Sequence, residues 1–287
     1  MLKQRIITAL VLAPLALGAI LFLPLQQFQI VIALIVGLGA YEWAQLSGIF
    51  WRPAKALYAL LLMALCVLLA MQVNVDVIWQ DGSIHPFYQG ILSVAAVWWV
   101  ASLLMIIAYP KQTGWWRNNT LIRGLFGILT LIPTWVAIVV LRTKDFHIDH
   151  YFGASMIFYV LGIVWAADIG AFFSGVKFGR RKLRPNVSPG KTLEGLYGGV
   201  MASLAIIGFA AFHFDVQGTE ILLHFVIGIL TVGVSALGDL NESMFKRSVG
   251  IKDSGKLLPG HGGILDRIDS LTAAFPVFTL CYVNWIA

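Results

Sequence analysis

Residues Ala54 to Met71 read AKALYALLLMALCVLLAM, and Lys55 is the only charged residue among them. An apolar run of this length is close to what an α-helix needs to cross the hydrocarbon core of a bilayer. The run lacks the alternation of apolar and polar residues that marks a membrane-spanning β-strand. This stretch therefore predicts a transmembrane helix.

The composition extends this prediction to the whole chain of 287 residues. Hydrophobic residues make up 59% and charged residues 12%, and the mean hydropathy is +0.83, whereas soluble domains carry about 25% charged residues. A soluble globular enzyme is excluded, and an all-α, polytopic membrane protein is predicted. About nine transmembrane helices are expected, over residues 6–25, 28–46, 54–71, 87–108, 121–141, 152–173, 193–212, 221–240 and 271–286.

The distribution of Lys and Arg selects the orientation of these spans. With a cytoplasmic N-terminus, all of the 20 Lys and Arg residues except Arg142 and Lys144 fall on the cytoplasmic side, as the positive-inside rule requires. Nine spans then place the C-terminus outside. The net charge of +6 is accounted for by this bias, and no nucleic-acid partner is expected.

The long charged connections, residues 174–192 and 241–270, both lie on the predicted cytoplasmic side. We therefore expect a catalytic membrane region over residues 151–287, with an active site that faces the cytoplasm. Residues 1–150 are expected to form five N-terminal membrane helices. Glu42, near the inner end of the second helix, is interpreted as an isolated interfacial residue.

Acidic side chains gather at the cytoplasmic ends of the C-terminal spans. Such residues are costly within a membrane and are commonly functional. The candidates are Asp168, Glu194, Asp239, Glu242, Asp266 and Asp269. Carboxylate oxygens bind Mg²⁺, and neighbouring Lys and Arg bind phosphate oxygens, so the pattern indicates phosphoryl or nucleotidyl transfer. In the alternative interpretation, these acids only pair with basic residues or stabilise a helix N-terminus.

Ser188 and Lys191 are candidate phosphate contacts. They belong to a segment, residues 188–192, that ends like a P-loop, but Pro185 stands where that motif requires glycine, and no strand is expected before it. A Walker A site is therefore excluded. The two residues stay candidates because they lie close to a helix N-terminus, where free N–H groups favour anions.

A glycine-rich loop directly precedes Asp266. Its Gly262 and Gly263 would let backbone N–H groups approach a bound oxyanion, and Lys252 precedes them in the chain. His261 has three open roles: a ligand, an acid or base, or a hydrogen-bonded loop residue.

These motifs resemble those of a known family. The signature of the phosphatidate cytidylyltransferases, also called CDP-diglyceride synthases, is similar at every fixed position to Ser243-x-Phe245-Lys246-Arg247-x4-Lys252-Asp253-x-Gly255-x2-Leu258-Pro259-x-His261-Gly262-Gly263-x-Leu265-Asp266-Arg267-x-Asp269. Two shorter pieces agree: Trp165-x2-Asp168-x-Gly170-Ala171-x2-Ser174-Gly175 and Ser188-Pro189-x-Lys191-Thr192-x-Glu194-Gly195. Residues 1–48 also resemble the bacterial members, so that the resemblance covers most of the chain.

The resemblance implies transfer of CMP from CTP to phosphatidic acid, giving CDP-diacylglycerol and pyrophosphate. It implies a homodimer in the bacterial inner membrane and a Mg²⁺ centre, and it leaves K⁺ open as a second metal. The implied metal ligands are Asp168, Asp239, Asp266 and Asp269, and the last three are the implied catalytic residues together with Lys191. The further phosphate contacts are expected to be Lys246, Arg247 and Lys252, while Arg267 pairs with the acids.

Three alternatives remain at this point. A CDP-alcohol phosphotransferase would also use aspartates and Mg²⁺, but its motif, D-G-x2-A-R-x8-G-x3-D-x3-D, does not occur in the sequence. A transporter would carry its polar residues near the membrane midplane and commonly contain repeats, whereas here these residues crowd one face. A catalytically silent paralogue is disfavoured only by the intact acids.

Overall fold

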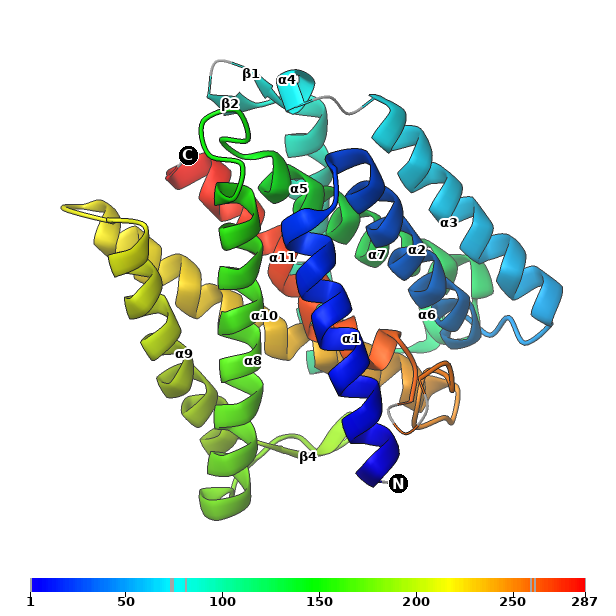
Figure 1. Ribbon diagram of the computed structural model, residues 1–287. Coiled ribbons are helices and arrows are strands. Elements are labelled where there is room, and N and C mark those ends of the chain that lie inside the picture. The colour runs from blue at the N-terminus through cyan, green and yellow to red at the C-terminus, as the bar shows by residue number, and fades with distance from the viewer. Residues whose placement is uncertain (1, 73–74, 81, 259, 261, 287) are drawn as a thin grey trace.

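The computed structural model describes residues 2–72, 75–80, 82–258, 260 and 262–286. Within them, nine long helices form a bundle, and the two chain ends lie at opposite ends of it (Figure 1). These helices are α1 (Leu2–Phe22), α2 (Leu25–Leu46), α3 (Arg52–Gln72), α5 (Pro86–Ala108), α7 (Thr120–Thr143), α8 (Phe152–Phe178), α9 (Leu193–His213), α10 (Glu220–Ser248) and α11 (Leu265–Trp285). Each coincides with one predicted span.

Shorter elements connect the bundle. Two are single helical turns, α4 (Val75–Ile78) and α6 (Gly114–Arg117). The others form two antiparallel hairpins: β1 (Trp79–Gln80) with β2 (Ser83–Ile84), and β3 (Lys182–Arg184) with β4 (Ser188–Thr192). The all-α prediction is thus correct for the bundle but omitted these hairpins.

Seven of the described helices, α2, α3, α5 and α7 to α10, are long and apolar enough to cross a membrane. Leucines of α3 such as Leu57 and Leu61 are more than half exposed, as expected of a helix that faces lipid. The chain is thus a mostly helical, multi-pass membrane protein. The apolar part of α1 is the shorter Leu10–Phe22, and α11 is not among the seven, so the count of nine stays a prediction.

Helix α7 lies at the centre of the bundle, where it packs against α2, α5, α8 and α11. Two tryptophan N–H groups link it to α2: Trp43 Nε1 donates to the Arg123 carbonyl at 2.9 Å, and Trp135 Nε1 donates to the Gln29 carbonyl at 3.0 Å. Such bonds satisfy polar groups that lipid cannot. The division at residue 150 stays a prediction, and helices from both sides of it pack together.

Helices α8 and α9 approach each other closely through small residues, as membrane helices commonly do. Gly170 of α8 lies against α9, where an added Cβ would stand 2.5 Å from the Gly198 carbonyl oxygen. This contact brings Asp168, two residues earlier on α8, close to the start of α9.

The close approach predicts the effect of one added methyl group. We expect Gly170→Ala to destabilise the protein by about 1–3 kcal/mol, because the helix backbones would have to separate. The melting temperature in detergent measures this effect. Gly208→Ala on α9 is the matched control, since nothing lies within 4 Å of its Cβ position. Equal melting temperatures for the two variants would contradict the packing described here.

The two long charged connections are more ordered than the sequence predicts. Helix α10 continues through Ser248 and α11 begins at Leu265, so that residues 241–248 and 265–270 of the predicted loop 241–270 are helical. In loop 174–192, the strand β3 precedes β4, although no strand was expected there. The hairpin is short and polar, without the alternation that signals a strand, and it ends where Thr192 Oγ1 caps α9 by accepting the Gly195 N–H at 3.1 Å.

Candidate active site

An ion pair between two predicted site residues joins the β3–β4 hairpin to α10. Lys191 Nζ lies 2.6 Å from Asp239 Oδ2, and Ser243 Oγ donates to Asp239 Oδ1 at 3.3 Å. Both members of the pair remain partly exposed. Because the pair is partly exposed, a phosphate group can reach Lys191 Nζ and replace the carboxylate as its partner.

The Lys191–Asp239 pair lies on the wall of a cavity of about 470 Å³ between α8, α9, α10 and β4. Asp168 is its third charged lining residue. The remaining walls are mostly apolar and include Phe172, Val176, Leu183, Leu196 and Val232. A cavity of this size suits a ligand, and its two kinds of wall suit one that is charged at one end and apolar at the other.

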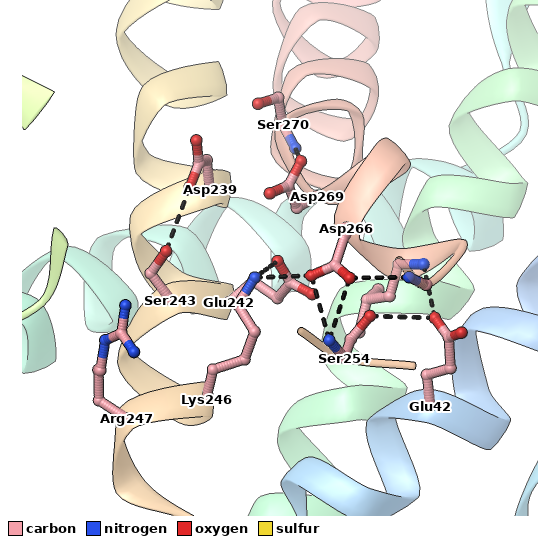
Figure 2. Close-up of polar contacts among 12 residues, drawn as sticks. Glu42, Asp239, Glu242, Ser243, Lys246, Arg247, Ser254, Asp266, Asp269 and Ser270 are labelled. Carbon is pink, nitrogen blue, oxygen red and sulfur yellow. Dashed lines mark hydrogen bonds and ion pairs between the residues drawn. The ribbon is translucent and has the colours of Figure 1, made fainter. Parts of the chain in front are cut away.

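Asp269, on α11, lies close enough to Asp239 and Lys191 to interact electrostatically with both, and Asp239 acts in the same way on Asp168. The Oδ1 atom of Asp269 accepts the Ser270 N–H at 2.8 Å. Figure 2 shows Asp239 and Asp269 on the neighbouring helices α10 and α11. The structure thus brings three of the four predicted metal ligands into one electrostatic group around Lys191.

The donor types of this group fit a hard divalent cation. Among the described residues, no three His, Cys, Asp or Glu side chains lie close enough to hold one ion by themselves. Mg²⁺, however, is commonly held by only one or two carboxylates together with substrate phosphates and waters. Asp239 and Asp269 can supply these carboxylates.

Asp266 is engaged in other contacts. Lys246 Nζ lies 2.7 Å from both Asp266 Oδ1 and Glu242 Oε2. The backbone N–H groups of Ser254 and Gly263 donate to Asp266 Oδ2 at 3.0 and 2.8 Å. These bonds make Asp266 an organiser of the glycine-rich loop, and Lys246 pairs with both Asp266 and Glu242, as Figure 2 shows.

Glu42 is not isolated, and that part of its interpretation was wrong. Its side chain is 1% exposed and reaches the C-terminal region. Glu42 Oε2 accepts the Ser254 hydroxyl at 3.1 Å and the Leu265 N–H at 2.8 Å. No local pattern signalled these contacts. The only hint in the sequence was a carboxylate placed in an otherwise uncharged helix.

Glu194 closes the β3–β4 hairpin. It accepts the backbone N–H groups of Arg180 and Arg181 at 3.1 Å, and Arg181 Nε donates to it at 2.9 Å. This hydrogen bond raises the pKa of the exposed Arg181 guanidinium above its ordinary value. Of the two interpretations of Glu194, the structural pairing is the one that these contacts support.

The remaining candidates are a serine, basic side chains and loop glycines. Ser188 lies at the start of β4, and Arg247 Nε donates to the Val187 carbonyl at 3.4 Å. Lys252 and Arg267 are exposed. Gly262 has a φ of +85°, which non-glycine residues rarely adopt. His261 lies outside the described residues.

Comparison with known proteins identifies the family of the chain. A family model described as the cytidylyltransferase family matches residues 3–285. A phosphatidate cytidylyltransferase of Pseudomonas aeruginosa is 44% identical over 278 residues, which cover 97% of this chain and 96% of that protein. One of Haemophilus influenzae is 39% identical over 286 residues, 98% and 99% of the two chains, and one of Staphylococcus haemolyticus is 34% identical over 203 residues, 64% and 78%. The chain belongs to the cytidylyltransferase family.

Proposed function

We propose that this protein transfers the cytidylyl group of CTP to phosphatidic acid, giving CDP-diacylglycerol and pyrophosphate for phospholipid biosynthesis. The observation that carries the proposal is the cavity between α8, α9 and α10, which has a Lys191–Asp239 pair on a largely apolar wall. A lipid phosphate can reach Lys191 there while its acyl chains stay among the helices. The family membership and the names of the similar proteins supply the nucleotide.

The reaction is an in-line displacement at the α-phosphorus of CTP. A phosphate oxygen of phosphatidic acid forms the new P–O bond, and the bond from the α-phosphorus to the oxygen shared with the β-phosphate breaks, releasing pyrophosphate. The attacking phosphate is already anionic at neutral pH, so that no strong base is needed. Catalysis then consists of positioning and of charge neutralisation.

The basic residues have different roles in this reaction, which follow from their surroundings. Lys191 contacts the phosphates at the cavity, and the exposed Lys252 and Arg247 meet the polyphosphate from the cytoplasmic side. Lys246 holds Glu242 and Asp266 in place. The N–H group of Gly262 adds a backbone donor to this phosphate site, whereas the N–H group of Gly263 is already bonded to Asp266.

Mg²⁺ is the proposed metal, held by Asp239 and Asp269 with Asp168 beside them. When bound, it would neutralise phosphate charge as the leaving group departs. Asp266 would support this centre through its contacts with the loop. K⁺ as a second metal and the homodimer remain predictions from the resemblance.

The reaction is tested with the purified protein in detergent, CTP and phosphatidic acid, with formation of CDP-diacylglycerol as the readout. We expect product with Mg²⁺ and none after chelation by EDTA, with activity restored by added Mg²⁺. When the protein is given CDP-diacylglycerol and an alcohol, we expect no release of CMP. Release of CMP would indicate a CDP-alcohol phosphotransferase. No product with both substrates and Mg²⁺ present would overturn the proposal.

The proposed topology is nine spans with a cytoplasmic N-terminus and an external C-terminus, in the bacterial inner membrane, with the active site facing the cytoplasm. The opposite positions of the two chain ends support it (Figure 1). We expect a cysteine at Lys256 to react with a membrane-impermeant maleimide only from the cytoplasmic side, and one at Gln217 only from outside. The native Cys66 and Cys281 are buried and give a low background. Labelling of both positions from the same side would contradict the topology.

A further inference from the structure

Glu42 connects the N-terminal helices to the candidate active site. It lies near the end of α2, and its Oε2 binds both the Ser254 hydroxyl and the Leu265 N–H. Figure 2 shows the chain of contacts that begins at Glu42 and continues through Ser254 and Asp266 to Lys246. A buried carboxylate of the second helix therefore takes part in the architecture of a site formed more than 200 residues later.

The bond to Leu265 caps α11 from outside. The first N–H groups of any helix lack partners within the helix, and the N-cap residue of α11, Ile264, provides no side-chain cap. Glu42 supplies the missing acceptor, and its negative charge is favourable at a helix N-terminus. Because α11 carries Asp266 and Asp269 in its first turns, Glu42 fixes the start of the helix that presents both acids.

Two glycines of the loop make room for Glu42. A Cβ on Gly255 would overlap Glu42 Oε1, and a Cβ on Gly263 would overlap both Glu42 Oε2 and the Ser254 hydroxyl oxygen. Neither glycine has a positive φ, so that proximity to the carboxylate explains their presence better than backbone conformation does. The loop is thus built around Glu42 on two sides.

The contacts continue from Glu42 into the site. Ser254 donates its hydroxyl to Glu42 and its backbone N–H to Asp266. Gly263 donates its N–H to Asp266, which in turn pairs with Lys246. Removing Glu42 would free the loop at Ser254 and at Leu265.

We propose that Glu42 is a positioning residue for the transfer reaction, holding Ser254, Gly263 and the N-terminus of α11 in the geometry that receives the polyphosphate. This inference rests on the proposed function. Glu42 is not among the residues that line the cavity between α8, α9 and α10. Its role therefore concerns the nucleotide and not the lipid.

The test compares steady-state kinetics of Glu42→Ala with those of the wild type, below the melting temperature of each. We expect kcat to fall about 10- to 100-fold, as for other supporting residues of a site. The KM for CTP should rise while the KM for phosphatidic acid stays the same. A purely structural role would reduce the active fraction and leave both KM values unchanged, and that result would overturn the proposal.

A double-mutant cycle with Gly255→Ala makes the test independent of a general folding defect. Gly255→Ala should raise the KM for CTP on its own, because its Cβ overlaps Glu42, but add little to Glu42→Ala, where that overlap is gone. Interacting residues give such non-additive effects, and distant ones do not. Full additivity would contradict the contact on which the proposal depends.

Two further variants complete the set. Glu42→Gln keeps an acceptor oxygen and should retain more activity than Glu42→Ala; if the alanine variant does not fold, Glu42→Gln and Gly255→Ala carry the test through the KM for CTP. Gln45→Ala, one turn along α2, is the control, since Gln45 accepts a bond from Lys55 and should leave both KM values unchanged. An inactive wild type would refute the proposed function, whereas an active wild type with an unaltered Glu42→Ala would refute only the role of Glu42.

Discussion

Changing Asp239 to asparagine is expected to lower kcat by about 100-fold or more, the scale on which removal of one stabilising group at a transition state acts. Asparagine keeps the shape of the side chain but removes the charge that faces Lys191 at 2.6 Å. It also removes one of the two proposed Mg²⁺ ligands. Formation of CDP-diacylglycerol at saturating CTP and phosphatidic acid measures the loss.

The fold should survive this change, because the Lys191–Asp239 pair is partly exposed and such pairs contribute little to stability. An unchanged melting temperature therefore accompanies the expected loss of activity. Asp215→Asn is the matched control: Asp215 lies beyond α9 at the other end of the bundle and has a φ of +50°, which asparagine tolerates. Wild-type activity in Asp239→Asn would show that Asp239 is not a ligand of the proposed metal site.

The second large effect concerns stability. Lys246→Met is expected to lower the free energy of unfolding by about 3–5 kcal/mol, because it leaves Glu242 and Asp266 as buried carboxylates without their cation. The two carboxyl side chains are only 2% and 9% exposed. A lower melting temperature in detergent is the readout, and Lys256→Met, which removes an exposed lysine, should leave it unchanged.

A compensating change separates charge from packing in this prediction. Adding Glu242→Gln to Lys246→Met removes one of the two uncompensated charges, so that part of the lost stability should return. If the double variant melts lower than Lys246→Met, the buried carboxylates are not the cause of the instability. Asp266 then remains held by the N–H groups of Ser254 and Gly263.

Hydropathy predicted the helices well because a membrane span is a long, local signal. Helix ends were less predictable. The predicted eighth span ends at Leu240, where polar residues begin, yet α10 continues to Ser248. The polar residues sustain the helix after it leaves the apolar layer, partly through the Glu242–Lys246 pair one turn apart. Hydropathy detects the end of the apolar segment and not the end of the helix.

The sequence predicted the membrane depth of the site residues, but not which of them contact one another. Lys191 and Asp239 were both assigned to the cytoplasmic side, and the structure pairs them. The sequence could not show that Glu194 closes a hairpin, since the spacing of Arg181 and Glu194 matches no helical or strand repeat. Glu42 was beyond reach for a different reason: its partners Ser254 and Leu265 lie 212 and 223 positions away, and no local pattern encodes such a contact.

The bond between Glu42 and Leu265 has a consequence for biosynthesis. A chain made from its N-terminus inserts α2 early, but Glu42 acquires its partners only when the final helix has emerged from the ribosome. Until then Glu42 lies near the end of α2 without these partners. A chain that ends before Leu265 would therefore lack this contact, together with Asp266 and Asp269 of the candidate site.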